Sequence, residues 1–441
     1  MRPVNAKARR DGLYLLLLGG TAFILLGGAL GYTYPVTMVD FRVLYQPARC
    51  LLRHADPYNE NEVLRISQAE RGSRPPDTEK VRQVVTQYIY PPTTFSFTVP
   101  FAMFPWGIAR LLWLMLTVGS LLFASFLIWS LGAGYAPVLS GALVGFLLAN
   151  SELLVITGNV AGIAISLCVV AVWCFVRERF VPWGILCLAV GLAVKPHDTG
   201  LVWLYFLLAG GVYRKRAWQT LLAMVVFCLP AVLWVWYVSP NWIQELQTNV
   251  AAFSVRGGMN DPGLNSTGAH GLGMLVSLQA LFGIVWDAPR IYNPASYLAF
   301  APPFFAWLFV TLRSPQSKAR TWLAIAAIAA LSMLPVYHRQ QDTKLLLLTV
   351  PACAMLWSEG GLTAWLALLV NSAGFVLAGD IPWAIFFGLV SKLHPSTSGF
   401  GGKVLIGMQV LPVPLILLIL GIFYLCVYMR RSDAHASSNA Q

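Results

Sequence analysis

The chain has 441 residues, of which 57% are hydrophobic and only 11% are charged, and its net charge is +12. A soluble domain carries roughly 25% charged residues, so this composition excludes a soluble enzyme or binding protein. A membrane-spanning helix needs about 20 apolar residues, so about twelve such helices still leave about 200 residues for loops. We therefore predict an all-α polytopic membrane protein with about 12 transmembrane helices.

Apolar runs along the chain define the expected spans. The first run, near residues 13–34, follows four basic residues and lacks a clear small-x-small cleavage site, so we interpret it as a retained span and not a signal peptide. A shorter stretch at 382–391 is a candidate re-entrant segment. The other expected spans lie near 107–131, 138–157, 159–176, 181–196, 199–213, 217–238, 294–312, 321–336, 343–357, 361–379 and 407–429.

The basic residues indicate the orientation of the chain. If the N-terminus is cytoplasmic, each short inner segment is basic, as the positive-inside rule requires. The long polar segments then all lie outside, which predicts cytoplasmic termini, a plasma-membrane location and chemistry on the extracytoplasmic face. This placement also accounts for the positive charge without a nucleic-acid partner. The inner basic residues are Arg2, Lys7, Arg9, Arg10, Arg177, Arg179, Arg214, Lys215, Arg216, Arg313, Lys318, Arg320, Arg430 and Arg431.

We expect one integral membrane domain over residues 1–430, followed by a short cytoplasmic tail at 431–441. Within the domain, residues 34–106 form the first extracytoplasmic loop and 239–293 the second. Six of the seven cysteines fall in apolar runs, so the sequence predicts no disulfide framework.

The first outer loop begins with apolar residues at helical spacing, which predicts an amphipathic helix at the membrane interface. Asp40 lies at the start of this helix, just above the outer end of the first span, and Arg42 and Tyr45 follow it. Two interpretations of Asp40 remain open. Either Thr37-x-x-Asp40 is a capping box that satisfies backbone donors, or the carboxylate takes part in chemistry.

Further polar clusters lie where spans emerge on the outer side. They are Tyr90-Pro91-Pro92, Gly158-Asn159, Lys195-Pro196-His197-Asp198 and Tyr337-His338-Arg339 with Asp342. Ionisable residues at membrane depth are costly and are functional candidates by default, although any single one fits a solvated turn equally well, and aromatic and proline residues at the interface are often anchors. Their convergence on one face favours a shared cavity.

The remaining motifs narrow the chemistry. The loop at 257–270 is rich in glycine and amide side chains, which suits a mobile loop over a sugar. The sequence has no P-loop and no HExxH or GxSxG motif, and its histidines lack zinc-ligand spacing, so we predict no cofactor and no metal. An activated substrate would then be a membrane lipid phosphate.

In these motifs the sequence resembles the polytopic C-fold glycosyltransferases of family 87. This family uses polyprenyl-phosphate sugars and includes mannosyltransferases of the phosphatidylinositol mannoside type. The resemblance rests on Asp40-Phe-x-Val-x-Tyr45 with Asp56-Pro57-Tyr58, on Tyr90-Pro91-Pro92, on Gly158-Asn159 and on Lys195-Pro196. Two places depart from the family pattern, His54-Ala55 and the turn at 337–344, and they bear on the choice of sugar or acceptor.

The resemblance implies a C-fold architecture and an inverting transfer of a hexose, with mannose as the family default, on the outer face of a bacterial membrane. The implied partners are a polyprenyl-phosphate sugar donor, a lipid or glycan acceptor and membrane lipids. Asp40 would be the general base, and cationic residues would stabilise the departing phosphate. The implied substrate-binding residues are Arg42, Tyr45, Tyr90, Asn159, Lys195, His197, His338, Arg339 and Asp342.

Two other functions fit the composition. A secondary transporter or lipid flippase has the same number of spans, but transporters place ionisable groups near the bilayer midplane, often within repeats. Here the ionisable groups cluster at the outer ends of the spans, and the two halves of the chain do not match. A scaffold that has lost activity is the third interpretation, and the presence of Asp40 argues against it.

Overall fold

A computed structural model of the chain describes residues 5–33, 37–71, 79–263, 274–313, 317–393 and 399–438. Over these ranges the chain is helical apart from connecting segments and one isolated β-bridge between Leu275 and Arg339. This confirms the all-α prediction. The helices of the first half are α1 (Ala6–Thr33), α2 (Val39–Leu52), α3 (Glu60–Arg71), α4 (Glu79–Thr86), η1 (Pro92–Thr94), α5 (Phe95–Ala102), α6 (Trp106–Gly132), α7 (Pro137–Leu148), α8 (Glu152–Thr157), α9 (Ala161–Arg177), α10 (Val181–Val194) and α11 (Pro196–Ala209).

The second half continues with long helices that alternate with short ones. They are α12 (Gly211–Val238), α13 (Trp242–Ser254), α14 (Leu278–Val285), α15 (Pro289–Arg313), α16 (Lys318–Leu331), η2 (Gln340–Thr349), α17 (Val350–Glu359), α18 (Gly361–Ala378), α19 (Asp380–Leu393), α20 (Gly399–Val410) and α21 (Pro412–Ser438). The stretch at 382–391 forms the middle of α19. Because α21 reaches Ser438, most of the expected tail is helical, and residues 439–441 lie outside the described residues.

Seven helical segments in the described part of the chain are long and apolar enough to cross a membrane: α1, α6, α7 with α8, α12, α15, α18 and α21. The other five expected spans coincide with shorter helices, namely α9, α10, α11, α16 and the η2–α17 pair. The structure therefore supports a polytopic membrane protein. Of the twelve expected spans, seven correspond to helical segments long enough to cross a membrane.

Helices α16 and α12 differ in burial. In α16 every residue from Arg320 to Leu331 is buried, so this short helix lies inside the bundle. In α12, by contrast, Leu222, Val226 and Leu233 are each about 60% exposed, with values of 66%, 64% and 59%. An apolar face of this kind requires lipid around it, because water does not solvate it favourably.

Helix α1 packs against α7 through glycines. A Cβ atom built on Gly19 would lie 2.1 Å from the carbonyl oxygen of Gly145, and one on Gly141 would lie 2.0 Å from the carbonyl oxygen of Gly12. Only glycine permits this approach of two backbones, which is a common way for helices to associate in membranes. The contact fixes the first span, and so the start of the loop that follows it.

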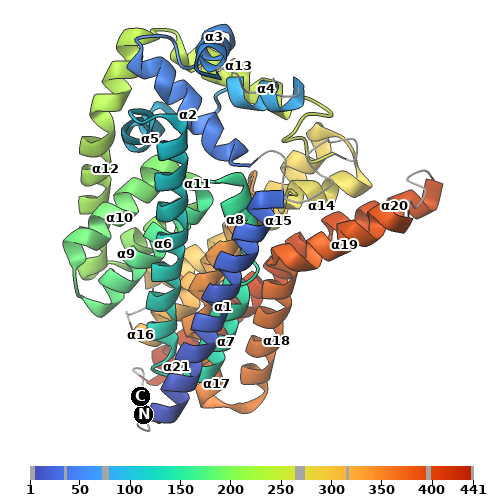
Figure 1. Ribbon diagram of the computed structural model, residues 1–441. Coiled ribbons are helices and arrows are strands. Elements are labelled where there is room, and N and C mark those ends of the chain that lie inside the picture. Colours follow the sequence, from blue (N-terminus) through green and yellow to red (C-terminus); the bar gives the residue numbers. More distant parts are fainter. Residues whose placement is uncertain are drawn as a thin grey trace.

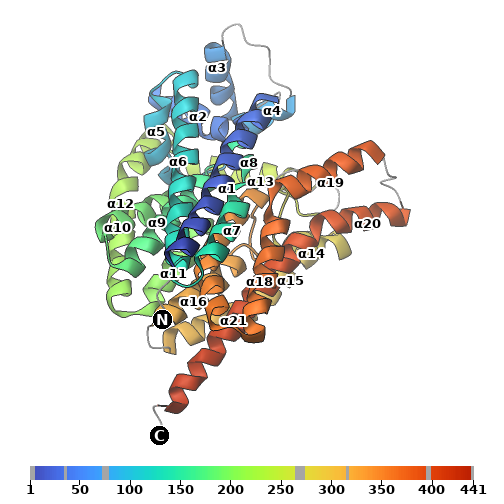
Figure 2. The same ribbon diagram turned by 60° about the horizontal axis from the view of Figure 1, so that its bottom comes forward.

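The two ends of the bundle differ in content. Both chain termini lie together at one end, whereas α2, α3, α4 and α13 gather at the opposite end (Figure 1). Helices α19 and α20 extend away from the bundle (Figure 2). The segments expected on the outer face thus lie together at the end remote from the termini.

Helix α2 is the amphipathic helix expected in the first loop. Phe41 stacks on Trp113 of α6 with ring centroids 4.3 Å apart, and the Tyr45 hydroxyl donates to the carbonyl oxygen of Phe104 at 2.9 Å. The helix begins after Met38, which adopts a φ of 61° and makes no side-chain capping bond. The predicted Thr37-x-x-Asp40 capping box is therefore wrong.

Candidate active site

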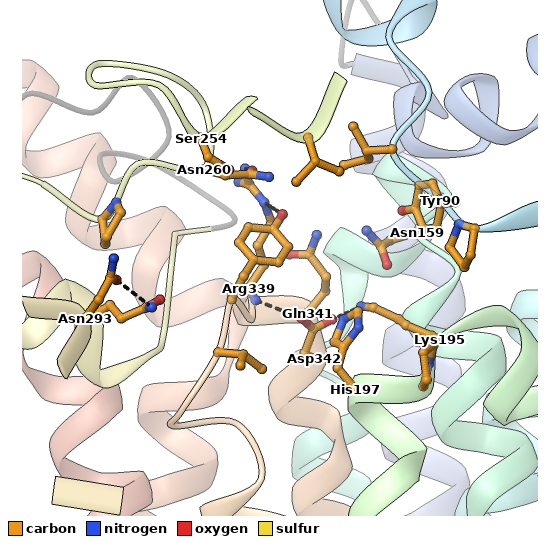
Figure 3. Close-up of a pocket in the computed structure, with 18 of the residues that line it drawn as sticks. Tyr90, Asn159, Lys195, His197, Ser254, Asn260, Asn293, Arg339, Gln341 and Asp342 are labelled. Carbon is orange, nitrogen blue, oxygen red and sulfur yellow. Dashed lines mark hydrogen bonds and ion pairs between the residues drawn. The ribbon is translucent and has the colours of Figure 1, made fainter. Parts of the chain in front are cut away.

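A cavity of about 520 Å³ opens between the ends of several helices (Figure 3). Its volume lies within the range of about 300–1,000 Å³ typical of small-molecule sites. A smaller cavity of about 140 Å³ adjoins it and reaches Asp40. Both cavities are lined by Ile89, Tyr90, Asn159, Asn260, Tyr337, Arg339 and Gln341.

Asp40 lies in the first turn of α2 and lines the smaller cavity. The Asn159 side-chain nitrogen donates to Asp40 Oδ2 at 2.8 Å, and Asn159 Oδ1 accepts from the backbone nitrogen of Ala161 at 2.8 Å. The second bond fixes the orientation of the amide, because only its oxygen can accept. Asn159 therefore holds the Asp40 carboxylate at the cavity wall.

Gly158 explains the first residue of the Gly158-Asn159 motif. Its φ is +65°, and a Cβ atom there would lie 2.9 Å from Met38 Sδ and 3.0 Å from Phe41 Cβ. The left-handed conformation and the close contact both favour glycine. The Gly158 carbonyl accepts from Trp113 Nε1 at 2.9 Å, so the turn is anchored on α6 as well as on α2.

Tyr90 belongs to a segment that is tied at two points. Its carbonyl accepts from the Tyr58 hydroxyl at 2.9 Å, and Thr93 Oγ1 donates to the carbonyl of Ala193 at 2.7 Å. Burial and, next, the nearby Asp40 carboxylate raise the pKa of Tyr90, so its hydroxyl stays protonated. The Tyr90-Pro91-Pro92 segment thus places a hydrogen-bond donor between Asp40 and the end of α10.

Lys195 is the central cation of the larger cavity. It lies at the junction of α10 and α11, where Pro196 occupies the first position of α11. Its ammonium group forms ion pairs with Asp342 and, at 3.2 Å, with Asp198 Oδ2. Burial alone would lower the pKa of Lys195, but the two carboxylates outweigh burial and raise it. Lys195 therefore keeps its charge at neutral pH.

Two histidines lie beside this ion pair. The rings of His197 and His338 have centroids 4.9 Å apart, and His338 is fully buried. Burial lowers the pKa of both rings, and for His197 the neighbouring Lys195 lowers it further. Both rings are therefore neutral at neutral pH and are able to accept a hydrogen bond or bind a cation through one nitrogen.

The stretch from Tyr337 to Asp342 is pinned on both sides. Its backbone pairs with the segment at Leu275, and Asp342 Oδ2 accepts from the backbone nitrogen of Arg339 at 2.7 Å. The Arg339 side chain donates to the Tyr337 hydroxyl, to the Met259 carbonyl at 3.0 Å and to Asn260 Oδ1 at 3.1 Å. Arg339 thus joins the amide-rich loop to the cavity. The rest of that loop, residues 264–270, lies outside the described residues.

The structure brings together most of the residues predicted from sequence. Tyr90, Asn159, Lys195, His197, Arg339 and Asp342 line the larger cavity, and Asp40 lines the smaller one. His338 lies behind His197. Arg42 and Tyr45, which are also on α2, are not among the residues that line either cavity, and Tyr45 lies in the aromatic core beneath α2.

Sequence reasoning left several lining residues out of the site. Asn260 came from a loop already noted for its amides, so it carried a local signal. Asp198, which pairs with Lys195 but lines neither cavity, belongs to the Lys195-Pro196-His197-Asp198 cluster already noted. Gln341, Tyr292 and Asn293 carried none, because single polar residues near span ends are common.

The fold and the cavity define a helical membrane protein with a charged site at one end of its bundle. Residues 88–335, more than half of the chain, match the model of glycosyltransferase family 87, and the chain belongs to this family. It is therefore a membrane glycosyltransferase. The matched range contains Tyr90, Asn159, Lys195 and His197, and it ends before His338 and begins after Asp40. No curated protein and no solved structure gave a significant match.

Proposed function

We propose that the protein transfers a hexose, with mannose as the default sugar, from a polyprenyl-phosphate donor to a lipid or glycan acceptor. In this proposal the cavity lies on the extracytoplasmic face of a bacterial plasma membrane, and both termini are cytoplasmic. The two terminal segments and the short loops expected on the same side of the membrane are rich in basic residues, and this supports that orientation.

One observation carries the proposal. Asp40 lines only the smaller cavity and Lys195 only the larger one, whereas Tyr90, Asn159 and Arg339 line both. The carboxylate and the buried ammonium therefore lie at different parts of one joined space. An inverting transfer needs this separation, because the base and the leaving group act on opposite sides of the anomeric carbon.

The chemistry follows from these positions. The Asp40 carboxylate takes the proton of the acceptor hydroxyl as the hydroxyl oxygen attacks the anomeric carbon. The bond from the anomeric carbon to the phosphate oxygen breaks, and the polyprenyl phosphate leaves with an additional negative charge. Lys195 and Arg339 stabilise that charge, and Tyr90 is placed to donate a hydrogen bond. The polar residues Asn260 and Asn293 are available to bind sugar hydroxyls.

The transporter alternative is less well supported. Its substrate site would lie near the bilayer midplane. The cavity here instead lies toward the end of the bundle where α2 and α13 gather, and the matched family consists of transferases.

Sugar transfer by the purified protein tests the proposal. The protein is incubated with radiolabelled polyprenyl-phosphate mannose, or with the glucose or galactose analogue, and a pool of membrane lipid acceptors. We expect transfer by the wild type and a rate at least about 100-fold lower for Asp40→Asn, since a general base contributes about 10²–10⁴-fold.

Asp11→Asn is the matched control, because Asp11 lies on α1 at the end of the bundle near the termini. It should keep the wild-type rate. Wild-type turnover by Asp40→Asn would exclude Asp40 as the base. Failure of every lipid-phosphate donor, with folded protein, would exclude the donor class.

A further inference from the structure

Three potential metal ligands converge beside Lys195, although they are far apart in sequence. One ligand atom each from His197, Asp198 and His338 lies within 4.8 Å of the other two. Asp198 Oδ1 is 3.5 Å from His338 Nε2 and 3.7 Å from His197 Nε2. A tetrahedral ion with bonds of about 2.0–2.1 Å holds its ligand atoms about 3.3–3.4 Å apart, so small side-chain movements would complete the site.

The protonation of His338 leaves a lone pair facing the cluster. Its Nδ1 lies 3.1 Å from the carbonyl oxygen of Val336, and its Nε2 lies 3.4 Å from the carbonyl oxygen of His197 and 3.5 Å from Asp198 Oδ1. A hydrogen on Nδ1, which has the shorter of the two carbonyl contacts, leaves the Nε2 lone pair facing Asp198 Oδ1. A backbone carbonyl that binds the other ring nitrogen is the usual arrangement around a metal-binding histidine.

The cluster also contains polar atoms without hydrogen-bond partners. Among the described residues, Asp198 Oδ1 and His197 Nε2 have no hydrogen-bond partner, and Asp198 Oδ2 is held by the ion pair with Lys195. Asp198 is 1% exposed, so bulk water does not supply hydrogen bonds to its carboxylate. Burying these polar atoms without partners is costly, and a cation bound between them would remove that cost.

Lys195 divides its single positive charge between Asp198 and Asp342, both of which are buried. Lys195 lies against Asp198 Oδ2, whereas the two histidines face Asp198 Oδ1. The carboxylate can therefore bridge the ammonium group on one side and a second cation on the other.

We propose that His197, Asp198 and His338 form a binding site for a divalent metal ion of the zinc or manganese type. Two imidazoles and one carboxylate are a ligand set that suits such ions. His197 also lines the larger cavity, so an ion bound to it would lie beside that cavity. There the ion would bind an oxygen of the donor phosphate, a role that rests on the proposed function.

Metal binding without substrate tests this site separately from sugar transfer. Untagged protein is stripped with a chelator, dialysed against Zn²⁺ and assayed for bound zinc by elemental analysis. Co²⁺ is used in parallel as a spectroscopic probe of coordination. We expect one chelator-sensitive ion per chain in the wild type, with Co²⁺ absorption typical of nitrogen and oxygen ligands.

The decisive variant is His197→Ala, because this side chain is 31% exposed and its loss should not disturb folding. We expect binding at least about 100-fold weaker, since even loss of a group that only orients a ligand costs about 10–100-fold. His338→Ala should behave in the same way, with folding checked by thermal unfolding. His54→Ala, an exposed histidine at the end of α2, is the control and should bind as the wild type does.

Two results would overturn the metal site. One is the absence of stoichiometric binding by folded wild-type protein, and the other is equal binding by the wild type and His197→Ala. Transfer activity that survives complete removal of the metal removes only the proposed role of the ion at the donor phosphate. Bound metal with no transfer from any donor leaves the site in place and removes the proposed function.

Discussion

Two buried lysines at the same end of the bundle are used in different ways. Lys344 donates to the carbonyls of Asn150 and Ala378, each at 2.7 Å, and to Asp380 at 3.0 Å. An ammonium group has three hydrogens, so Lys344 is fully satisfied by the protein. Lys195 instead has two carboxylates around it and lines the larger cavity.

This difference in contacts indicates that Lys344 has a structural role, whereas Lys195 is a candidate for a role in chemistry. Lys344 ties the break between α7 and α8 to the start of α19, and it lines neither of the cavities at the candidate site. Lys195 holds its charge at a surface that a substrate can reach. Both ammonium groups are buried and ion-paired. They differ because Lys344 has a protein acceptor for each of its three hydrogens, whereas Lys195 lines the larger cavity.

Lys195→Met is the variant with the largest expected effect on activity. Loss of a charge that stabilises the leaving phosphate should lower the transfer rate by about 10²–10³-fold. The measurement is the rate at saturating donor, with Lys215→Met, an exposed lysine on α12, as the control. A rate within a factor of three of wild type would show that the two lysines are not functionally different.

Lys344→Met should lower stability, as loss of Lys195 also does by leaving Asp198 and Asp342 unpaired, but it should not lower turnover. Removing one partner of a buried ion pair costs about 3–5 kcal/mol, and here two backbone carbonyls lose a donor as well. We expect a large drop in the thermal unfolding midpoint in detergent and near-normal turnover per folded molecule. Unchanged stability together with lost turnover would place Lys344 in the active site and break the comparison.

Gly158→Ala gives a smaller effect that tests how Asp40 is held. The left-handed conformation costs a residue with a Cβ about 1–2 kcal/mol, and the new atom crowds Met38 and Phe41. We expect both lower stability and lower turnover, because Asn159 moves away from Asp40. Gly119→Ala on α6 is the control, since no atom lies within 4 Å of its added Cβ. If Gly158→Ala changed stability and turnover no more than Gly119→Ala does, Gly158 would not be needed to hold Asn159 beside Asp40.

Much of the fold and site was predictable from the sequence, and the limits have physical causes. Apolar runs and basic inner segments place the long helices, because both follow from transfer of side chains between water and lipid. The same runs do not distinguish a lipid-facing helix from an internal one. That is why the sequence predicts a membrane span equally for the buried α16 and for the exposed α12.

The pairings inside the site could not be predicted in the same way. Asn159 and Asp40 are 119 residues apart, and Lys195 and Asp342 are 147 apart. Local spacing predicted that Asp40 begins a helix, and this is confirmed, but it also indicated a capping box that does not form. The carboxylate bonds to Asn159 because Gly158 allows the chain to approach α2, and this contact depends on tertiary packing.

The anomeric configuration of the product is the most direct test of the central claim that Asp40 acts as a base opposite the leaving phosphate. The product of the purified wild-type protein and a donor of known configuration is isolated, and the coupling constants of its new glycosidic bond are measured by NMR. The account predicts inversion relative to the donor. Retention of configuration would contradict it, because retention requires a covalent or front-face mechanism that this arrangement does not provide.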